Sequence, residues 1–472
     1  MVGIVSYGAY VPVYRLSRAE ISRAWSKQAI SGEKAVAYYD EDSLTMAVAA
    51  ARSCVVEIDS KSIGGLYFAS VTSPYREKQA AVTIATVLDM SLEAYTVDIC
   101  NSLRAGTSAM RIAMDAISND STDNILVSAA DCRLGMPNSD AEMSFGDGAA
   151  AFLIGKTNVV AEIEGVYGIS NELLDVWRSD KDAFVRSWES RFVYSEGYTR
   201  IVTQAVSTAM KRYNLTPKDF AKVVLYTPDS RQLGTVARKL GFDLATQVQD
   251  TLYPKIGNTG TAQPLLALIA ALEDAKAGDR ILLASYGDGC DVFVLRVTKE
   301  IEKLRSKRGV KGQLEAKLMT TYNRYLRWRE LIEVEPPAVP PMEQPSPVAL
   351  WRDTHGGLTL HGVKCKRCGT IQYPVQRVCG VCRAKDEFDD YMFADKVGKL
   401  VTFSHDNLGN LIDPPNTVAV VDFPEGGRIT FDMTSRDPSE VKIGMSVAMV
   451  FRKIRYVGGF YDYWWKCCPV RG

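Results

Sequence analysis

Two stretches of this chain repeat one pattern, a helix rich in small residues followed by an apolar strand. The predicted helices span 105 to about 117 and 259 to about 272, and the predicted strands 124–131 and 280–287. The second helix starts 154 positions after the first (259 against 105), and the second strand 156 after the first (280 against 124). Glycine and alanine let helices lie close to a sheet and to each other. The pattern predicts two similar α/β halves with a site at their junction. A chance similarity between two βα units is the alternative.

Length and charge narrow the class of protein. The chain has 472 residues, which suggests roughly three domain-sized units. Its 56 basic and 56 acidic side chains cancel, so no basic surface for nucleic acid is predicted. No apolar run is long enough to span a membrane, and residues 1–12 do not resemble a signal peptide. We therefore expect a soluble cytoplasmic protein that binds neither nucleic acid nor a membrane.

The front of the chain contains no histidine. All three histidines, His355, His361 and His405, lie after residue 354. Histidine is the usual general base near neutral pH. Any acid–base chemistry in the front section must therefore use another side chain.

Four of the ten cysteines have the spacing of a zinc ribbon. Cys365 and Cys368 form one Cys-x-x-Cys pair, and Cys379 and Cys382 form a second after ten intervening residues. Two such pairs can bring four thiolates around one tetrahedral zinc ion. Because no position is left for water, we expect a structural zinc that does no chemistry. Paired free thiols are the alternative.

The end of the chain has the pattern of a small β-barrel. Residues 336–347 are proline-rich and predict an extended linker, and residues 312–335 before them predict one helix. Alternating runs separated by turns predict an antiparallel barrel of the OB type; examples are 400–404, 418–423, 428–432 and 447–451. The aromatic run 459–465 is expected to serve core packing or docking rather than nucleic-acid stacking.

These boundaries divide the chain into five segments. The predicted segments are a first α/β half (1–158), a second half ending in a helix (159–335), a linker (336–348), a zinc ribbon with its preceding segment (349–385) and an OB-fold (386–472).

Several motifs of the front section occur together in one known family. They are Val2-Gly-Ile-Val-Ser-Tyr-Gly-Ala-Tyr-Val-Pro, Asp175-Val-Trp-Arg, Tyr253-Pro-Lys-Ile-Gly-Asn-Thr-Gly, Ala284-Ser-Tyr-Gly-Asp-Gly and Tyr325-Leu-Arg-Trp-Arg. In combination, residues 1 to about 332 resemble the archaeal and bacterial 3-hydroxy-3-methylglutaryl-CoA synthases of the thiolase superfamily. Residues from about 349 to 472 resemble the small zinc-ribbon/OB-fold proteins that accompany thiolase-like enzymes acting on acyl-CoA.

The resemblance implies a fold and a substrate carrier. The implied fold is α/β, a duplicated five-layered αβαβα thiolase fold followed by a zinc ribbon and a small antiparallel β-barrel. It also implies a homodimer and a coenzyme A thioester that enters between the halves. A separate thiolase or hydratase is a candidate partner.

The catalytic side chains of that family are replaced here. Anchored on Asp98 and on the Ala-Gly-Thr motif, the resemblance places Leu103 where the family has its nucleophilic cysteine. Cys100 lies three residues earlier, on the predicted incoming strand. Val71 stands at the position of the glutamate base and Tyr226 at that of the histidine. The asparagine of the Gly-Asn-Thr motif remains as Asn258.

The remaining groups favour a reaction without an acyl-enzyme. Leucine cannot hold an acyl group, so Claisen chemistry is not expected. An aldol or retro-aldol reaction on a β-hydroxyacyl-CoA needs only a stabilised thioester enolate and a proton transfer. Tyr226 is the candidate for the proton transfer and is better matched as an acid, because a phenol titrates near pH ~10; an aromatic filler is the alternative. Asn258 and the backbone amides near Leu103 are candidates for holding the enolate, although Asn258 could instead cap its helix.

Other residues and functions are open at this point. Ser285 and Tyr286 are predicted to line the substrate pocket, with a structural role as the alternative. The loop Gly287-Asp-Gly289 is a further candidate for enolate binding, whereas Asp131 is expected to form a turn. One alternative function is a hydroxymethylglutaryl-CoA synthase or thiolase-type acyltransferase with relocated catalytic residues. Another is a non-catalytic CoA-binding or channelling scaffold.

Overall fold

The computed structural model describes residues 1–227, 230–304, 309–335, 345–408 and 411–471. The chain forms two compact units. The first comprises Met1–Ala37, Asp42–Ala85 and Asp89–Tyr322, and the second Tyr38–Glu41, Thr86–Leu88 and Asn323–Gly472. Most of the predicted linker, residues 336–344, lies outside the described residues. In the described ranges, no helix combines the length and apolarity that crossing a membrane requires.

One long sheet forms the framework of the first unit. Its strand order is β11-β12-β13-β8-β1-β7-β6-β4-β5. The strands are β1 (Gly3–Tyr10), β4 (Gly65–Ala69), β5 (Tyr95–Ile99), β6 (Asn124–Asp131), β7 (Gly148–Gly155), β8 (Ala161–Ser170), β11 (Lys222–Leu225), β12 (Arg280–Tyr286) and β13 (Gly289–Val297). The halves repeat one topology, because β4–β6 and β11–β12 are parallel whereas β6–β7 and β12–β13 are antiparallel. The predicted duplication is confirmed.

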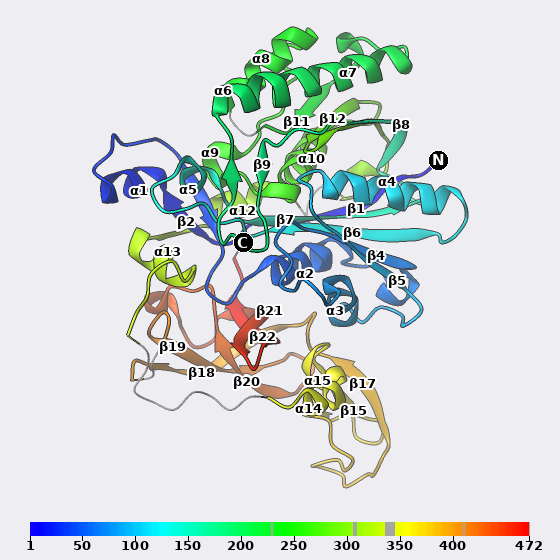
Figure 1. The fold of residues 1–472 in the computed structure, drawn as a ribbon. Helices are drawn as coiled ribbons and strands as arrows, with labels where there is room; N and C mark the ends of the chain where they lie inside the picture. Colours follow the sequence, from blue (N-terminus) through cyan, green and yellow to red (C-terminus); the bar gives the residue numbers. More distant parts are fainter. Residues whose placement is uncertain (228–229, 305–308, 336–344, 409–410, 472) are drawn as a thin grey trace. The chain divides into compact units, whose positions relative to one another are not determined.

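Helices cover the sheet and lie between its halves (Figure 1). Helix α2 (Ser43–Cys54) packs on β1, β6 and β7 of the first half, and α7 (Arg200–Arg212) packs on β8, β12 and β13 of the second. Helix α4 (Ala105–Ser118) contacts strands of the first half. Helix α10 (Gln263–Asp274) contacts β1 and β7 as well as β11 and β12, so it belongs to a central layer. The two halves of the sheet, with α2 and α7 on them and α4 and α10 between them, give the order helix, sheet, helix, sheet, helix of the predicted five-layered fold.

The central layer depends on small side chains. A Cβ atom on Gly106 of α4 would lie 3.0 Å from the carbonyl oxygen of Thr261 and 2.9 Å from Leu265 Cδ1. The neighbouring Ala109 and Ala113 are fully buried in the same cluster. The glycine and alanine positions of the repeated motif therefore allow the close approach of the two central helices, as predicted.

The predicted single helix over 312–335 is wrong. The chain forms α12 (Lys311–Glu315), β14 (Leu318–Thr320) and α13 (Tyr322–Trp328) there. Strand β14 pairs in parallel with β2 (Tyr14–Ser17). Backbone hydrogen bonds to this distant strand override the local helical pattern, which carries only a weak preference.

Shorter elements complete this part of the fold. They are β3 (Glu33–Val36), β9 (Val176–Trp177), β10 (Arg186–Ser187), α1 (Arg18–Ala24), α3 (Ala80–Val87), α5 (Asp140–Ser144), α6 (Ser190–Phe192), α8 (Ser230–Leu240), α9 (Tyr253–Ile256) and α11 (Ile301–Leu304).

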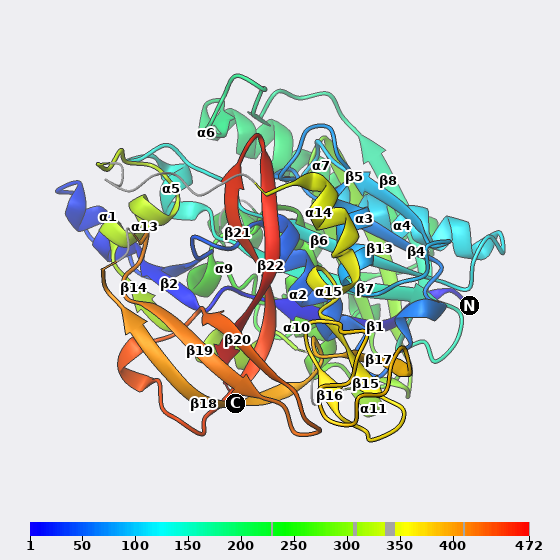
Figure 2. The same ribbon diagram turned by 90° about the horizontal axis from the view of Figure 1, so that it is seen from below.

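The second unit contains a closed barrel with the order β18-β19-β20-β22-β21. Its strands are β18 (Val397–Asp406), β19 (Asn416–Asp422), β20 (Arg428–Met433), β21 (Ser446–Val457) and β22 (Phe460–Pro469). β21 and β22 form a long antiparallel hairpin (Figure 2). Trp465 of β22 is fully buried, and its indole N–H donates to the Leu358 carbonyl at 2.9 Å. The predicted barrel and its aromatic core are confirmed. Helices α14 (Pro347–Arg352) and α15 (Thr354–Gly357) precede it in the chain.

A buried ionic cluster in the second unit includes residues from the front of the chain. Asp40 accepts hydrogen bonds from Lys466 Nζ at 2.9 Å and Thr434 Oγ1 at 2.8 Å, and Glu41 pairs with Arg452 at 3.0 Å. Burial by itself raises the pKa of Asp40, but Lys466 and Arg452 outweigh it and hold that pKa below its ordinary value. The segment 38–41 is therefore bound into this unit by charge.

We predict that Gly260→Ala destabilises the first unit more than Gly278→Ala does. Both glycines have positive φ angles, +64° and +92°. An added Cβ would lie 2.2 Å from Asp131 Oδ2 at Gly260, but would meet nothing within 4 Å at Gly278. Gly278→Ala should cost about 1 kcal/mol and Gly260→Ala at least about 2 kcal/mol more. Urea unfolding followed by fluorescence measures the difference, and equal losses would contradict this account.

Candidate functional site

The predicted catalytic residues meet where β11 and β12 end. Tyr226 directly follows β11, and its backbone N–H donates to the Ala284 carbonyl of β12 at 2.8 Å. Asn258 lies just before η4 (Gly260–Ala262), and its side-chain nitrogen donates to the Tyr226 hydroxyl at 3.1 Å. Both residues are only 3% exposed. Sites commonly form at the carboxyl ends of parallel strands.

Hydrogen bonding leaves the Tyr226 proton available. The Gly260 N–H donates to Asn258 Oδ1 at 3.0 Å, so the Asn258 amide nitrogen faces Tyr226 and the phenolic oxygen is the acceptor. Among the described residues, no group accepts the Tyr226 proton in return. Burial raises the pKa of Tyr226 above its usual value near 10.0, opposed by the charge of Arg133 and the bond from Asn258. The phenol is therefore protonated at neutral pH and suited to donate.

Asp131 links the two halves instead of forming the expected turn. Within the described ranges, its Oδ1 accepts hydrogen bonds from Ser70 Oγ, the Val71 N–H and Thr72 Oγ1 at 2.8–3.0 Å. Its Oδ2 accepts from the N–H and the hydroxyl of Thr261 at 2.8 and 3.0 Å. The carboxylate thus ties the loop after β4 to η4 (Gly260–Ala262), the turn that leads into the central helix α10.

Arg133 is a site residue that sequence reasoning missed. It is only 5% exposed, and its guanidinium carbon lies 3.9 Å from the centroid of the Phe145 ring. Of the charged groups that act on Tyr226, it has the largest effect. The sequence contains only a weak indication of this role, because an arginine two residues after the end of a buried strand is not a specific pattern.

Asp175 and Tyr286 form a second buried pair. The Tyr286 hydroxyl donates to Asp175 Oδ2 at 2.5 Å, and Tyr198 packs edge-on against Tyr286 with the ring centroids 5.8 Å apart. Burial and the bond to Asp175 raise the pKa of Tyr286 far above its usual range. Because its proton is held by Asp175, Tyr286 is less suited to transfer one than Tyr226.

Of the other predicted substrate-binding residues, Gly287 lies beside Leu103, just before α4. Leu103 is half-buried two residues before α4, and a Cβ on Gly287 would lie 3.1 Å from its backbone nitrogen. The Gly287 N–H donates to the Gly289 carbonyl at 3.1 Å, so that amide is already used. Gly289 has φ +125° and a Cβ there would meet the Ile169 carbonyl at 2.0 Å, which requires glycine for pairing with β8. Ser285 is fully buried, and its Oγ has no partner in the described part of the chain.

Cys100 lacks the properties of a nucleophile. It is the first residue after β5 rather than part of that strand, and its side chain reaches solvent. Partial desolvation and the carboxylates of Asp98 and Asp131 raise the pKa of its thiol. A nucleophilic cysteine needs the opposite shift, because only the thiolate attacks.

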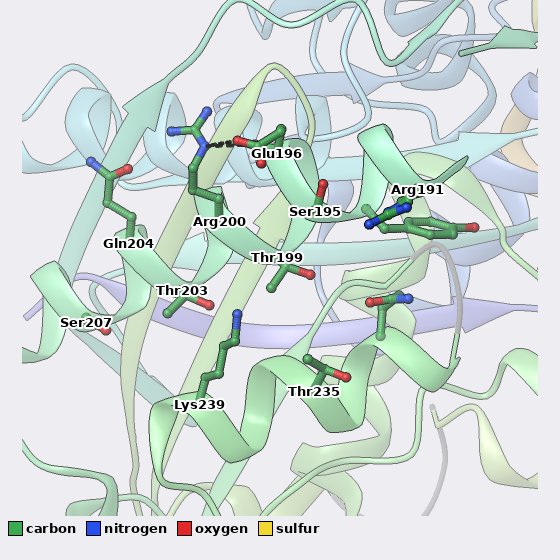
Figure 3. Close-up of a pocket in the computed structure, with 12 residues that line it drawn as sticks. Arg191, Ser195, Glu196, Thr199, Arg200, Thr203, Gln204, Ser207, Thr235 and Lys239 are labelled. Atoms are coloured by element: carbon green, nitrogen blue, oxygen red, sulfur yellow. Dashed lines mark hydrogen bonds and ion pairs between the residues drawn. The ribbon is translucent and has the colours of Figure 1, made fainter. Parts of the chain in front are cut away.

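A polar pocket of about 920 Å³ lies between η2 (Val193–Thr199), α7 and α8 (Figure 3). Its cationic lining residues are Arg191, Arg200 and Lys239, and its carboxylate is Glu196, which pairs with Arg200 at 3.4 Å. Hydroxyl and amide side chains supply most of the remaining lining. The same element η2 carries Tyr198, which packs on Tyr286. A positive, hydrogen-bonding pocket of this kind suits a ligand that carries phosphates.

The four predicted zinc ligands lie together. Their Sγ atoms are all within 4.8 Å of one another, with Cys365–Cys382 at 3.6 Å and Cys368–Cys379 at 3.5 Å. Thiolates about 2.3 Å from a tetrahedral zinc would be about 3.8 Å apart. Cys365 ends β15 (His361–Cys365), and Cys368 lies in the turn that leads to β16 (Ile371–Gln372). Cys379 and Cys382 lie in the loop between β16 and β17 (Phe388–Met392), and the three strands form one small sheet. The donor set and spacing fit one tetrahedral ion.

Parts of the chain match two described families. Residues 210–297 match "3-Oxoacyl-[acyl-carrier-protein (ACP)] synthase III C terminal", and residues 393–452 match "ChsH2, C-terminal OB-fold domain". The solved structure of an HMG-CoA synthase complexed with CoA has a TM-score of 0.64 at 19% identity, over 69% of this chain and 89% of that one. These similarities agree with the thiolase-like fold and the OB-fold barrel.

Whole-length relatives share the first part of the chain. The hydroxymethylglutaryl-CoA synthase of Methanopyrus kandleri is 34% identical over 345 residues, covering 70% of this chain and 98% of the relative. That of Methanocaldococcus jannaschii is also 34% identical, covering 71% of this chain and all of the relative (100%). The chain belongs to the hydroxymethylglutaryl-CoA synthase family of enzymes.

Proposed function

We propose that this chain catalyses an aldol or retro-aldol reaction on a β-hydroxyacyl-CoA, without a cysteine nucleophile. The buried Tyr226–Asn258 pair, with its available phenolic proton, carries the proposal. In the condensation direction, the α-carbon of a thioester enolate attacks the carbonyl carbon of the second substrate. The new Cα–Cβ bond leaves an alkoxide, which takes the Tyr226 proton. Cleavage runs the same steps in reverse: the β-hydroxyl proton passes to the Tyr226 oxygen as the Cα–Cβ bond breaks and its electrons return to the enolate, which requires the minor deprotonated form of Tyr226 that its raised pKa leaves at neutral pH.

Asn258 is the proposed enolate-binding group. Its amide nitrogen has two hydrogens, and one of them is directed at Tyr226. The second can donate to the enolate oxygen, where negative charge develops. The fixed Oδ1 bond to Gly260 holds the amide in place, so little reorganisation is needed at the moment of reaction.

We infer that the pocket between η2, α7 and α8 binds the phosphates of coenzyme A. Three cations line it, and its α8 residues Gln232, Thr235 and Lys239 follow Tyr226 closely in the chain. A structurally similar HMG-CoA synthase has been solved with CoA bound, which supports this substrate carrier. A homodimer, and a separate thiolase or hydratase as partner, are further parts of the proposal.

An acyltransferase of the synthase type is the second candidate. It is favoured by the 34% identity to the Methanopyrus kandleri synthase over nearly all of that protein. It would require a nucleophile in place of Leu103, and the raised pKa of Cys100, the nearest cysteine in the sequence, opposes that role. A CoA-binding scaffold without turnover is the remaining alternative.

We predict that Tyr226→Phe abolishes turnover while Cys100→Ala leaves kcat within about twofold. Phenylalanine keeps the ring but removes the proton donor, and general acid catalysis typically contributes 10²–10⁴-fold. Both variants are assayed on a panel of β-hydroxyacyl-CoA thioesters. The rate of cleavage is measured from the release of the carbonyl product. The reverse result, in which Cys100→Ala loses turnover and Tyr226→Phe retains it, would contradict the aldolase proposal.

Two further outcomes separate the alternatives. Intact-protein mass spectrometry after incubation with acetyl-CoA would establish the acyltransferase if it showed a covalent acyl adduct. Tight acyl-CoA binding with no turnover across the panel would favour the scaffold.

We predict that Lys239→Gln weakens binding of coenzyme A by about tenfold, because it removes a charge-assisted contact to phosphate. Calorimetry with free CoA measures the change. The control is Lys211→Gln, an exposed lysine of α7 that does not line the pocket. If the two variants bound free CoA with equal affinity, the CoA phosphates would not bind in this pocket.

We propose that Cys365, Cys368, Cys379 and Cys382 hold one structural zinc ion. Cys379→Ser should lose the metal and lower the thermal stability of the second unit, because four thiolates are needed to close the site. Elemental analysis of the purified protein measures zinc per chain. Cys100→Ser, which changes a cysteine of the first unit, should retain the metal, and a zinc-free wild type would refute the assignment.

A further inference from the structure

The proposed reaction includes a second proton transfer, to which no side chain has yet been assigned. Forming the enolate removes a proton from the α-carbon of the thioester, and cleavage returns a proton to that carbon. Tyr226 is assigned to the β-oxygen, and Val71, at the position of the family's glutamate base, has no titratable group. Another side chain near Tyr226 must therefore exchange the α-proton.

Two buried carboxylates of the first unit already have donors on both oxygens. Asp131 accepts hydrogen bonds from the loop after β4 and from Thr261. Asp291 pairs with Arg104 through Oδ1 at 3.1 Å and accepts from the Thr107 hydroxyl through Oδ2 at 2.9 Å. Neither carboxylate has an oxygen directed at a group that could pass it a proton from a substrate.

Asp175 differs from these two because the donor directed at it is a phenol of the candidate site. Its Oδ1 accepts from the Val176 N–H at 2.6 Å, and its Oδ2 accepts from the Tyr286 hydroxyl at 2.5 Å. Asp175 is 7% exposed, and in the ranges the structure describes no lysine or arginine forms an ion pair with it. Because a phenolic oxygen can accept one hydrogen while it donates another, Tyr286 can pass its proton to Asp175 as it receives a new one.

The Tyr286 side chain belongs to the same buried cluster as Tyr226. Parallel pairing of β11 with β12 brings the two tyrosines to neighbouring strand ends. Leu103, at the position of the family's nucleophile, packs against the cluster that contains them both. Burial is the largest cause of the raised pKa of Tyr226, and the nearby charge of Asp175 adds to it. The Tyr286–Asp175 pair is therefore within electrostatic reach of the group proposed for the β-oxygen.

Two residues of η2 fix the orientation of Tyr286. The Tyr198 ring packs edge-on against it, with the ring centroids 5.8 Å apart. A Cβ atom on Gly197 would lie 2.5 Å from the Tyr286 Oη, so the place of this hydroxyl requires glycine. The phenol is thus held against Asp175. The bond that makes Tyr286 a poor donor to an alkoxide makes its oxygen a better proton acceptor, because donation polarises the hydroxyl.

We propose that Tyr286, backed by Asp175, exchanges the proton of the substrate α-carbon, whereas Tyr226 serves the β-oxygen. In condensation, the α-proton passes to the Tyr286 oxygen, the phenolic proton passes to Asp175 Oδ2, and the C–H electron pair becomes the enolate. In cleavage, the enolate carbon takes a proton from Tyr286, which regains one from Asp175. This inference rests on the proposed function, because it requires a thioester enolate near Tyr226.

Deuterium uptake at the α-carbon tests this step apart from carbon–carbon bond chemistry. The full-length protein is incubated in D2O with acetyl-, propionyl- or butyryl-CoA, which have α-protons but no β-hydroxyl, and uptake is measured by mass spectrometry. The wild type should catalyse uptake into at least one of them. Tyr286→Phe and Asp175→Asn should each lower the rate about 100-fold or more, whereas Tyr226→Phe should keep it within about threefold. Asp175→Glu, which keeps a carboxylate, should restore part of the rate.

Two controls separate a proton-transfer role from a structural one. Affinity for free CoA, measured by calorimetry, should be unchanged in every variant. Tyr213→Phe removes another hydroxyl that contacts the same half of the sheet, where it donates to the Val166 carbonyl at 2.7 Å, and it should leave uptake unchanged.

Several results would overturn the assignment. They are no uptake by the wild type with any of the three thioesters, uptake retained in Tyr286→Phe, or equal losses in Tyr226→Phe and Tyr286→Phe, which would give both transfers to Tyr226. If Tyr286→Phe does not fold, the wild type and Asp175→Asn, which nearly preserves the size of the side chain, still decide.

This inference and the proposed function fail in different ways. Loss of binding for every thioester would remove both. Uptake that depends on Tyr286, together with full cleavage activity of Tyr226→Phe, would remove the role of Tyr226 but leave that of Tyr286. Cleavage that depends on Tyr226, together with uptake that does not depend on Tyr286, would do the reverse.

Discussion

The buried carboxylate of Asp131 is the interaction on which the geometry of the first unit depends. Burying an ionised carboxylate is tolerated only when its lone pairs are filled. Here donors from the loop after β4 fill one oxygen, and both donors of Thr261 fill the other. Thr261 is adjacent to Gly260, whose N–H orients the Asn258 amide, which in turn contacts Tyr226. A clamp between two halves of a duplicated fold therefore also sets the direction of the candidate catalytic groups.

Much of the fold could be predicted because its signals are local. The helices that open with small residues, and the strands that follow them, have bounds close to the predicted ones. A buried apolar run has few conformations besides helix and strand in which its backbone N–H and C=O groups are hydrogen-bonded. The alternation of the barrel strands is equally local, as is the spacing of Cys365 and Cys368. The candidate roles of Tyr226 and Asn258 followed from their places in two separate family motifs, whereas the hydrogen bond that joins them is a finding of the structure.

What could not be predicted depends on contacts between residues distant in sequence. No local pattern in residues 318–320 predicts the pairing with β2, which takes the place of the predicted helix. The position of Arg133 over Phe145 requires the structure, as does the bond from Tyr286 to Asp175 across 111 positions. The Gly287 amide was a reasonable candidate for oxyanion binding until its bond to Gly289 was seen.

The ionic cluster of Asp40 and Glu41 makes the fusion of the two parts hard to undo. Cutting the chain at the proline-rich segment would leave these carboxylates on one polypeptide and their buried partners Lys466 and Arg452 on the other. Removing one partner of a buried ion pair typically costs about 3–5 kcal/mol, because the other charge is left uncompensated. Two separate polypeptides would have to form these pairs at every assembly. Joining them in one chain turns a concentration-dependent encounter into an intramolecular one and keeps the two parts in equal number.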